Sequence, residues 1–169
     1  MKRILDETLA RDEKLYNVFQ IFLLTGARPS DVLNFKVGDF NFDEKILYIR
    51  ISKTNREIKF PLYDELLKFI ETNMKDVFSK DSTEFVFKSF TINSVSKRFM
   101  RIKKKLGLKE KFVYTLKTFR KTFATRMAKR GVPIHEVAYM LGHESIQTTK
   151  KYYTEVLVDN LREKINTTN

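Results

Sequence analysis

Cysteine is absent from the 169-residue sequence, and only two histidines and five glycines occur in it. The absence of cysteine excludes disulfides, thiolate metal sites and a cysteine nucleophile. Two histidines, His135 and His143, leave little for a metal site, and no clustered acidic set replaces them, which argues against a metal-dependent nuclease. The few glycines form no phosphate-binding loop, so a kinase or P-loop protein is excluded.

Long hydrophobic runs are also lacking. No stretch approaches the roughly 20 residues needed to cross a bilayer, and the amino terminus has no apolar core of a signal peptide. A length of 169 residues suits a single compact domain with a sizeable core. We therefore expect a soluble, cytoplasmic protein that makes no membrane contact.

Positive charge is concentrated in one part of the chain. Lysine and arginine number 33 against 21 acidic residues, which gives a net charge of +12. Between Lys97 and Arg130, fourteen residues are basic and only Glu110 is acidic. This clustering indicates a polyanion as partner, and we favour binding to a DNA backbone over an ordinary solvated helix face. The expected phosphate contacts are Lys97, Arg98, Arg101, Lys104, Lys105 and Lys121.

The stretch from Tyr114 to Thr154 holds two predicted helices and most of the chemically useful side chains. Apolar residues recur at helical spacing on both sides of a break, where Gly131 ends the first helix and Pro133 begins the second. Gly142 ends the second helix, so His143 follows a helix terminus and its side chain can reach into a cleft. The two apolar sets are Phe119, Phe123 and Met127, and then Ile134, Val137, Ala138 and Leu141.

Before this stretch the hydrophobic pattern changes its period. Helical spacing predicts an amphipathic helix from Leu15 that ends at Thr25-Gly26, after a loosely packed, charged lead-in helix at residues 1–13. Alternation then predicts a β-hairpin with Lys53 near its tip and Pro61 at its end. The fold class that we predict is mainly α with a small three-stranded antiparallel sheet. Its other elements are a short helix at Asp31–Phe35, a helix around Leu66–Ile70, a short strand at Glu84–Phe87 and a helix between Thr91 and Gly107.

Five short motifs occur in order along the chain. Each is weak alone, but together they cover almost the whole sequence, and they resemble the catalytic domain of the tyrosine recombinases, the phage-integrase family. The resemblance implies a DNA strand transferase that forms a 3′-phosphotyrosyl intermediate and uses no metal or other cofactor. The motifs are LLTGARPSDVLNF with Arg28, ISKTNREIKFPL with Lys53, TLKTFRKTFAT with Lys117 and Arg120, LGHES with His143, and TTKKYY with Tyr152 and Tyr153.

The resemblance implies a role for each side chain, and the residue types suit those roles. Arg28 and Arg120 would hold the non-bridging oxygens of the scissile phosphate, where guanidinium groups stay charged at any working pH. His143 would donate a hydrogen bond to the same phosphate. Lys53 would protonate the departing 5′ oxygen. A tyrosine would attack, and the energy of the broken bond would be kept in the phosphotyrosyl link.

Two positions leave alternatives open. The family usually has histidine where this chain has Lys117, and a lysine accepts a proton only where its surroundings favour the neutral amine. Lys117 is therefore either the general base or a phosphate contact. Tyr152 lies nine residues after His143, which is the spacing that the family favours, whereas the YT string at Tyr153 also resembles the sequence around the nucleophile. We take Tyr152 as the nucleophile and Tyr153 as the alternative.

The resemblance also carries expectations about domains and assembly. Family members normally have an additional amino-terminal DNA-clamping domain, and this sequence begins where the catalytic part would. We therefore expect residues 1–169 to form one catalytic domain without the clamp. We expect four protomers to assemble on double-stranded DNA of a nucleoid or mobile element. The assembly would use a tail at residues 155–169, in which Val158, Leu161 and Ile165 have helical spacing.

Two other classes of protein fit the same residues. A type IB topoisomerase-like enzyme would use these groups to relax DNA of any sequence, and a DNA-binding module without chemistry would keep the fold alone. Each side chain also has a structural alternative. Arg28 could pair with Asp31, Lys53 could be part of a solvated turn, His143 could cap a helix, and the two tyrosines could be packing groups. His135 has no motif around it, so a surface or partly buried structural histidine is expected.

Overall fold

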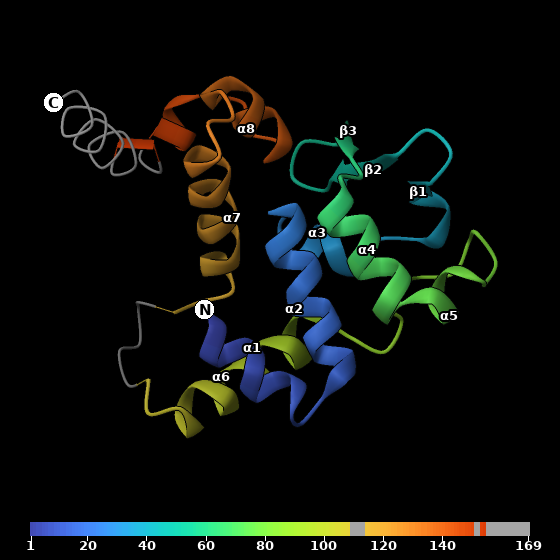
Figure 1. Cartoon of the computed structure of the whole chain (residues 1–169), viewed down its shortest axis with the longest axis vertical. Coiled ribbons are helices and arrows are strands. Elements are labelled where there is room, and N and C mark those ends of the chain that lie inside the picture. The colour runs from blue at the N-terminus through green and yellow to red at the C-terminus, as the bar shows by residue number, and fades with distance from the viewer. Residues whose placement is uncertain (109–113, 151–152, 155–169) are drawn as a thin grey trace, which may run out of the picture.

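A computed structural model describes residues 1–108, 114–150 and 153–154 of the chain. Within these ranges the protein is mainly α-helical with one small antiparallel sheet, as the sequence predicts (Figure 1). None of its helices there is long and apolar enough to span a bilayer. The elements are α1 (Lys2–Leu9), α2 (Glu13–Thr25), α3 (Pro29–Leu33), the 3-10 turn η1 (Val37–Asp39), β1 (Phe40–Asn41), β2 (Ile46–Ile51), β3 (Arg56–Pro61), α4 (Asp64–Asn73), α5 (Lys75–Phe78), α6 (Ile92–Lys105), α7 (Lys117–Lys129) and α8 (Ile134–Met140).

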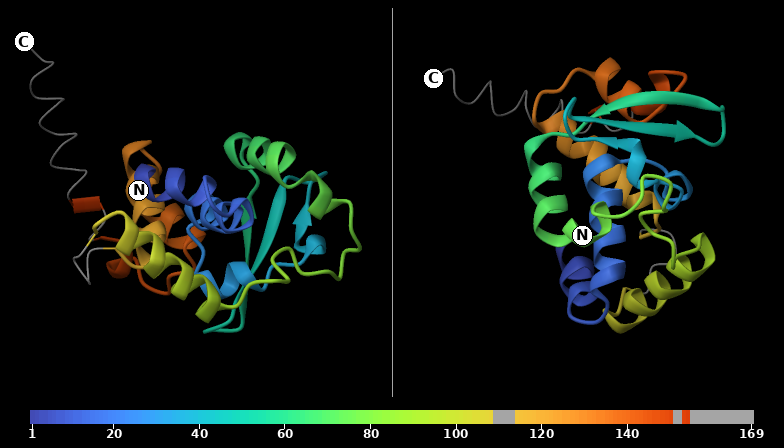
Figure 2. Two further views of the ribbon diagram at one scale, coloured as in Figure 1. Left: turned by 90° about the horizontal axis from the view of Figure 1, so that it is seen from below. Right: turned by 90° about the vertical axis from the view of Figure 1, so that its right-hand side faces the viewer.

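Strands β2 and β3 form the predicted hairpin, and β1 pairs with the other edge of β2. Leu47 lies opposite Phe60 and Ile49 lies opposite Ile58, and all four side chains are buried. The residues between them are more exposed, because successive side chains of a strand point to opposite faces. Figure 2 shows the hairpin crossing the end of the molecule at which α8 lies. The alternating pattern in the sequence therefore predicted the hairpin.

The strand predicted at Glu84–Phe87 is wrong, because this segment does not join the sheet. Phe85 makes an isolated antiparallel bridge with Lys36, and the chain turns directly after it. Val86 and Phe87 are both buried, so the short apolar run reflects burial in the core. Periodicity alone does not separate such a run from a buried strand. The third strand is β1 instead, which has only two residues.

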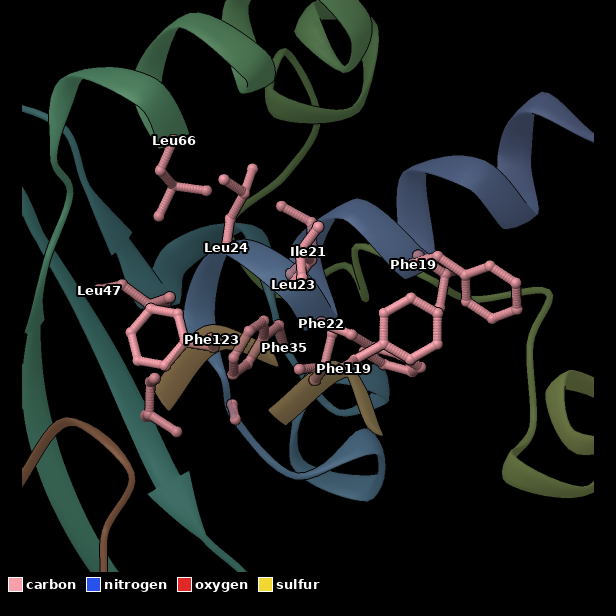
Figure 3. Close-up of a cluster of buried hydrophobic side chains, with 14 of the residues drawn as sticks. Phe19, Ile21, Phe22, Leu23, Leu24, Phe35, Leu47, Leu66, Phe119 and Phe123 are labelled. Carbon is pink, nitrogen blue, oxygen red and sulfur yellow. The ribbon is translucent and has the colours of Figure 1, made fainter. Parts of the chain in front are cut away.

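Helix α2 lies at the centre of the core and meets α7 from the far end of the chain (Figures 1 and 3). The ring centroids of Phe19 on α2 and Phe119 on α7 are 4.9 Å apart. One turn further along α7, the ring of Phe123 lies 6.1 Å from that of Phe60 on β3. Burial of aromatic side chains on this scale is a large share of a domain's stabilisation. Helix α7 thus joins the helical core to the sheet and fixes where its own polar residues stand.

Helix α1 packs more closely than predicted. Its Ile4 is 1% exposed, and the helix lies against α2 and α6. Glu7 forms ion pairs with Arg11, just after the end of α1, and with Lys105 of α6, the latter at 2.8 Å. Ile4 and Thr8, four residues apart, share the buried face, whereas the charged residues lie toward solvent or α6. The high charge of this segment concealed a small but continuous apolar face.

Glu65 at the start of α4 joins that helix to the end of α7. Its two carboxylate oxygens accept hydrogen bonds from Arg126 and Arg130, each at 2.7 Å. Partial burial raises the pKa of Glu65, but the hydrogen bonds from Arg130 and Arg126 outweigh it, so the pKa lies below its usual value. All three side chains are about a third or more exposed, so solvent screens the attraction.

Replacing Glu65 with glutamine should therefore lower the free energy of unfolding at neutral pH by about 1 kcal/mol or less. Because the folded-state pKa is lowered, the wild-type advantage should be fully present above the unfolded value of about 4.3. It should disappear as the pH falls through the folded-state value. Urea denaturation of both proteins across this range measures the difference. The control is Glu71→Gln on an exposed part of α4, and an advantage of Glu65 that persisted in acid would contradict the ion-pair account.

Candidate active site

A cleft of about 650 Å³ lies where five separate parts of the chain meet. The contributing parts are the start of α3, the hairpin tip, the start of α6, the start of α7 and the segment after α8. Five of the predicted catalytic residues line this cleft, namely Arg28, Lys53, Lys117, Arg120 and His143. Its other lining residues are Pro29, Ser30, Thr54, Ile92, Leu116, Gly142, Glu144, Ser145 and Thr148.

Arg28 stands at the start of α3 beside a buried carboxylate. Pro29 is the first residue of α3, so Arg28 takes the extended conformation that precedes the helix. Its Nη1 atom lies 3.7 Å from Oδ2 of Asp31, which is 3% exposed. The other carboxylate oxygen accepts hydrogen bonds from the hydroxyl of Ser52 at 2.5 Å and from its backbone N–H at 3.3 Å. Asp31 therefore links Arg28 to the base of the turn that carries Lys53.

The exposed side chain of Lys53 projects from the hairpin turn just beyond a tightly packed strand end. Ile51, the last residue of β2, is 2% exposed and lies against Gly142. A Cβ atom at Gly142 would come within 2.1 Å of Cδ1 of Ile51, so a larger residue would have to displace Ile51 and would also be strained by the positive φ of this position. This contact sets the hairpin against the segment that carries His143.

Arg120 is held by the carboxyl-terminal ends of two helices. Its Nη1 donates to the carbonyl of Gly26, which caps α2, at 2.8 Å, and its Nη2 donates to the carbonyl of Leu141, which caps α8. Helix carboxyl termini carry partial negative charge and attract cations. The guanidinium group is thus fixed in orientation while it lines the cleft. Such a rigid, charged fork suits binding of a phosphate.

His143 follows α8 as the sequence predicts, and its ring is held by Thr149. The Nδ1 atom lies 2.7 Å from the hydroxyl oxygen of Thr149, a residue with 0% exposure. The backbone N–H of His143 donates to the carbonyl of Ala138 at 2.9 Å, which completes the end of the helix. His135 is an exposed residue near Glu136, as expected for a surface histidine.

Lys117 is the first residue of α7, and its side chain is exposed in the cleft. The amino terminus of a helix presents unpaired backbone N–H groups and partial positive charge, both of which favour an anion. The amine of Lys117 suits either predicted role, proton acceptor or phosphate contact. The cleft as a whole is strongly basic: four lysines and arginines line it, and Glu144 is its one acidic lining residue among those described. No group of three or more acidic or histidine residues that could hold a metal ion occurs within the described ranges.

Tyr153 is described and Tyr152 is not. The Tyr153 side chain is 9% exposed, and its hydroxyl donates to the carbonyl of Val132 between α7 and α8. Burial, assisted by the charge of Glu136, raises the pKa of Tyr153 to about 12. Tyr153 is not among the residues that line the cleft. Tyr152 and the predicted tail residues Val158, Leu161 and Ile165 lie outside the described residues.

The basic face of α6 is only partly available to a ligand. Arg98 pairs with Asp12 at 2.5 Å and Lys105 pairs with Glu7 at 2.8 Å, so two of the predicted phosphate contacts are already neutralised by acidic side chains. In the part of the chain that the structure describes, no carboxylate pairs with the four other predicted contacts, which are all exposed: Lys97, Arg101, Lys104 and Lys121. The charge pattern predicted the face but not these pairings.

Three features of the site were not predicted. Asp31 was considered only as a partner for Arg28, and its bonds to Ser52 were missed. The two carbonyl acceptors of Arg120 and the contact between Thr149 and His143 were also missed. Each of these contacts forms only when the chain folds, and a sequence does not indicate which backbone carbonyl will accept a hydrogen bond. The position of Thr149, six residues after a histidine, is the one local signal that was present.

Comparison with known proteins connects this geometry to a family. The sequence model of the phage integrase family matches residues 1–159. The chain belongs to this family. Tyrosine recombinase XerA of Pyrococcus horikoshii is 34% identical over 151 residues, which cover 86% of the chain and 52% of that protein. XerA of Pyrococcus furiosus is 32% identical over 148 residues, with 86% and 51% covered. The chain thus spans about half the length of these phage integrase relatives.

Solved structures of the phage integrase family share the fold. A XerA recombinase crystal structure has a TM-score of 0.70 at 24% identity and is matched over 90% of this chain and 55% of its own. XerH bound to a palindromic difH substrate has a TM-score of 0.74 at 20% identity, with 97% and 50% covered. A lambda integrase tetramer bound to a Holliday junction has a TM-score of 0.70 at 20% identity, with 89% and 45% covered. These similarities establish the catalytic-domain fold.

Proposed function

We propose that this chain is the catalytic domain of a site-specific DNA recombinase that cuts and rejoins strands through a covalent tyrosine link. The observation that carries the proposal is the cleft. Five side chains from four separate motifs, Arg28, Lys53, Lys117, Arg120 and His143, line one basic depression, although up to 115 residues separate them in the sequence. A depression rich in guanidinium and ammonium groups suits a phosphodiester. Membership of the phage integrase family supports the same conclusion.

We propose the following reaction for these groups. Arg28 and Arg120 bind the non-bridging oxygens of one phosphate, and His143 donates a hydrogen bond to it. The tyrosine oxygen attacks the phosphorus, and the bond from phosphorus to the 5′ oxygen breaks. Lys53 delivers a proton to that oxygen, while the tyrosine's proton passes to Lys117 or to solvent. Attack by a 5′ hydroxyl on the phosphotyrosyl bond reverses the sequence, so no step consumes a nucleotide, and we propose that none requires a metal.

We propose Tyr152 as the nucleophile. Tyr153 is committed to packing: its hydroxyl is bonded to Val132, its pKa is raised, and it does not line the cleft. A nucleophilic phenol must lose its proton, and burial of Tyr153 disfavours the charged phenolate. The nine-residue spacing from His143 to Tyr152 also supports this choice.

Double-stranded DNA and further copies of the chain are the partners that we infer. The exposed residues Lys97, Arg101 and Lys104 of α6 extend the positive charge away from the cleft and would bind the phosphate backbone. XerH is described on its difH substrate and lambda integrase as a tetramer on a Holliday junction, and both share the present fold. We propose a similar assembly through the tail at residues 155–169. Sedimentation of the DNA complex formed by Val158→Asp tests it, and unchanged assembly would remove the tail from the interface.

Covalent trapping tests the proposed function and names the nucleophile. A nicked duplex that releases a short 5′ fragment after cleavage would be incubated with wild type, Tyr152→Phe and Tyr153→Phe in a chelating buffer. A protein–DNA adduct should appear on a denaturing gel with wild type and should be abolished in Tyr152→Phe, because no oxygen remains to attack. Tyr153→Phe should keep the adduct at a reduced protein stability.

Other outcomes of the trapping experiment separate the alternatives. An adduct that survives Tyr152→Phe and is lost in Tyr153→Phe would transfer the role to Tyr153. Salt-sensitive DNA binding without an adduct from any protein would favour the binding module over the enzyme. Relaxation of supercoiled DNA irrespective of its sequence would favour the topoisomerase-like activity.

A further inference from the structure

Five threonines in helical segments of this protein use their hydroxyl protons in the same way. Each of the five donates to the carbonyl oxygen four residues earlier, which is a common local bond for a helical threonine. The bond satisfies the hydroxyl inside the helix and leaves nothing for other partners. The threonines that do so are Thr8, Thr25, Thr122, Thr125 and Thr154, with oxygen–oxygen distances from 2.6 to 3.1 Å.

Thr149 departs from this pattern. It lies on a helical turn after His143, is completely buried, and its hydroxyl oxygen lies 2.7 Å from Nδ1 of His143. Among the described residues, it makes no bond to the carbonyl of Ser145, four residues earlier. The hydroxyl group of Thr149 therefore faces the imidazole of His143 and not the backbone carbonyl.

We propose that Thr149 is a positioning residue that donates its hydroxyl proton to Nδ1 of His143. A neutral imidazole has one nitrogen that accepts and one that donates, and the bond made by the first decides which nitrogen carries the proton. With Nδ1 as the acceptor, the ring is held as the Nε2–H tautomer. The opposite arrangement, in which Nδ1–H donates to Thr149, would leave a buried hydroxyl proton without an acceptor, which is unfavourable.

The tautomer matters because His143 lines the cleft. A histidine that stabilises a phosphate must present an N–H, and a fixed N–H requires no reorganisation when charge develops. Thr149 fixes the N–H of His143 through its contact with Nδ1. It lies three residues before Tyr152 in the sequence. The tautomer of His143 can be tested whether or not the protein cleaves DNA, whereas the consequence of the tautomer for cleavage rests on the proposed function.

Nuclear magnetic resonance tests the tautomer directly, because the protein has only two histidines. Long-range proton–nitrogen spectra of nitrogen-15-labelled protein, recorded where both rings are neutral, distinguish Nε2–H from Nδ1–H. We expect Nε2–H for His143 in wild type and in Thr149→Ser, which keeps the hydroxyl. Thr149→Val has almost the same shape but no hydroxyl, so His143 should become a mixture of tautomers. The signals of His135, which is exposed, provide the internal reference and should not change.

Cleavage measurements complete the test. Removing a donor to a reacting phosphate altogether slows a reaction by about a hundredfold or more, so loss of its orientation in Thr149→Val should slow single-turnover cleavage by about tenfold. DNA affinity should stay unchanged, and Thr149→Ser should restore most of the rate. Melting temperatures of both variants identify any loss of folding.

The possible results are distinguishable. An Nδ1–H tautomer in wild type, or a valine variant with the wild-type tautomer, would overturn the positioning role. A valine variant with altered tautomers that cleaves at the wild-type rate would overturn its catalytic consequence. Altered tautomers in a protein that never cleaves DNA would overturn the proposed function and leave the positioning role intact.

Discussion

Replacing Arg120 with lysine is expected to slow DNA cleavage by about a hundredfold or more while the affinity for DNA changes much less. The guanidinium group is aimed by its bonds to the carbonyls of Gly26 and Leu141. An ammonium group keeps the charge but has no planar fork, so it cannot satisfy both carbonyls and a phosphate oxygen in one fixed geometry. Single-turnover cleavage at saturating DNA measures the loss, and a binding titration measures the affinity.

A matched variant on α6 should show the opposite behaviour. Lys97→Ala combined with Lys104→Ala removes two exposed cations that do not line the cleft. DNA affinity should fall, and the slope of its logarithm against that of salt concentration should shrink by about 2, because each phosphate contact contributes about 0.9. The rate at saturating DNA should stay the same. Equal losses of affinity and rate in Arg120→Lys would identify Arg120 as an ordinary backbone contact.

Gly26→Ala should strongly destabilise the fold. Gly26 ends α2 with φ near +62°, and an added Cβ atom would lie 2.3 Å from the ring of Phe123 and 2.9 Å from Leu141. The left-handed conformation costs a non-glycine residue about 1–2 kcal/mol. Crowding a packed core adds about 1–3 kcal/mol. We expect the free energy of unfolding to fall by about 2–5 kcal/mol in total, as measured by denaturant titration.

Gly131→Ala separates the two contributions to this loss. Gly131 also has a positive φ, near +79°, but an added Cβ atom there would meet nothing within 4 Å. Its substitution should cost only the backbone contribution, about 1–2 kcal/mol. The difference between the two variants is then the crowding against Phe123. Equal losses would show that the ring moves aside freely and that the fit at Gly26 is loose.

Much of the helical framework could be predicted because its signals are local. The fourfold spacing of Phe119, Phe123 and Met127 is a property of one segment, and all three side chains are buried as expected. The ends of helices at Gly26 and Gly142 are likewise local, since both residues have positive φ. The order of the motifs also predicted which side chains line the cleft, because these residue types in this order resemble one catalytic site.

The remainder depends on contacts between distant segments. The run at Glu84–Phe87 is apolar enough for a strand, but its neighbours in space leave no sheet edge beside it. The pairing of Arg98 with Asp12 joins residues that are 86 positions apart and neutralises the positive charge of Arg98. Asp31 was visible as an acidic neighbour of Arg28, yet nothing in the sequence indicates that Ser52 would also bind it. Such details follow from the packed fold alone.

Two contacts at the base of the hairpin turn limit how far Lys53 can move. Ile51 is wedged over Gly142, and Ser52 is bonded to Asp31 through both its hydroxyl and its backbone N–H. We infer that the strands stay in place and that Lys53 moves only by rotation of the chain after Ser52 and of its own side chain. Its reach is then about one side-chain length, so the DNA backbone must come to the lysine. The position of the hairpin would therefore make protonation of the departing 5′ oxygen depend on how far the duplex has entered the cleft.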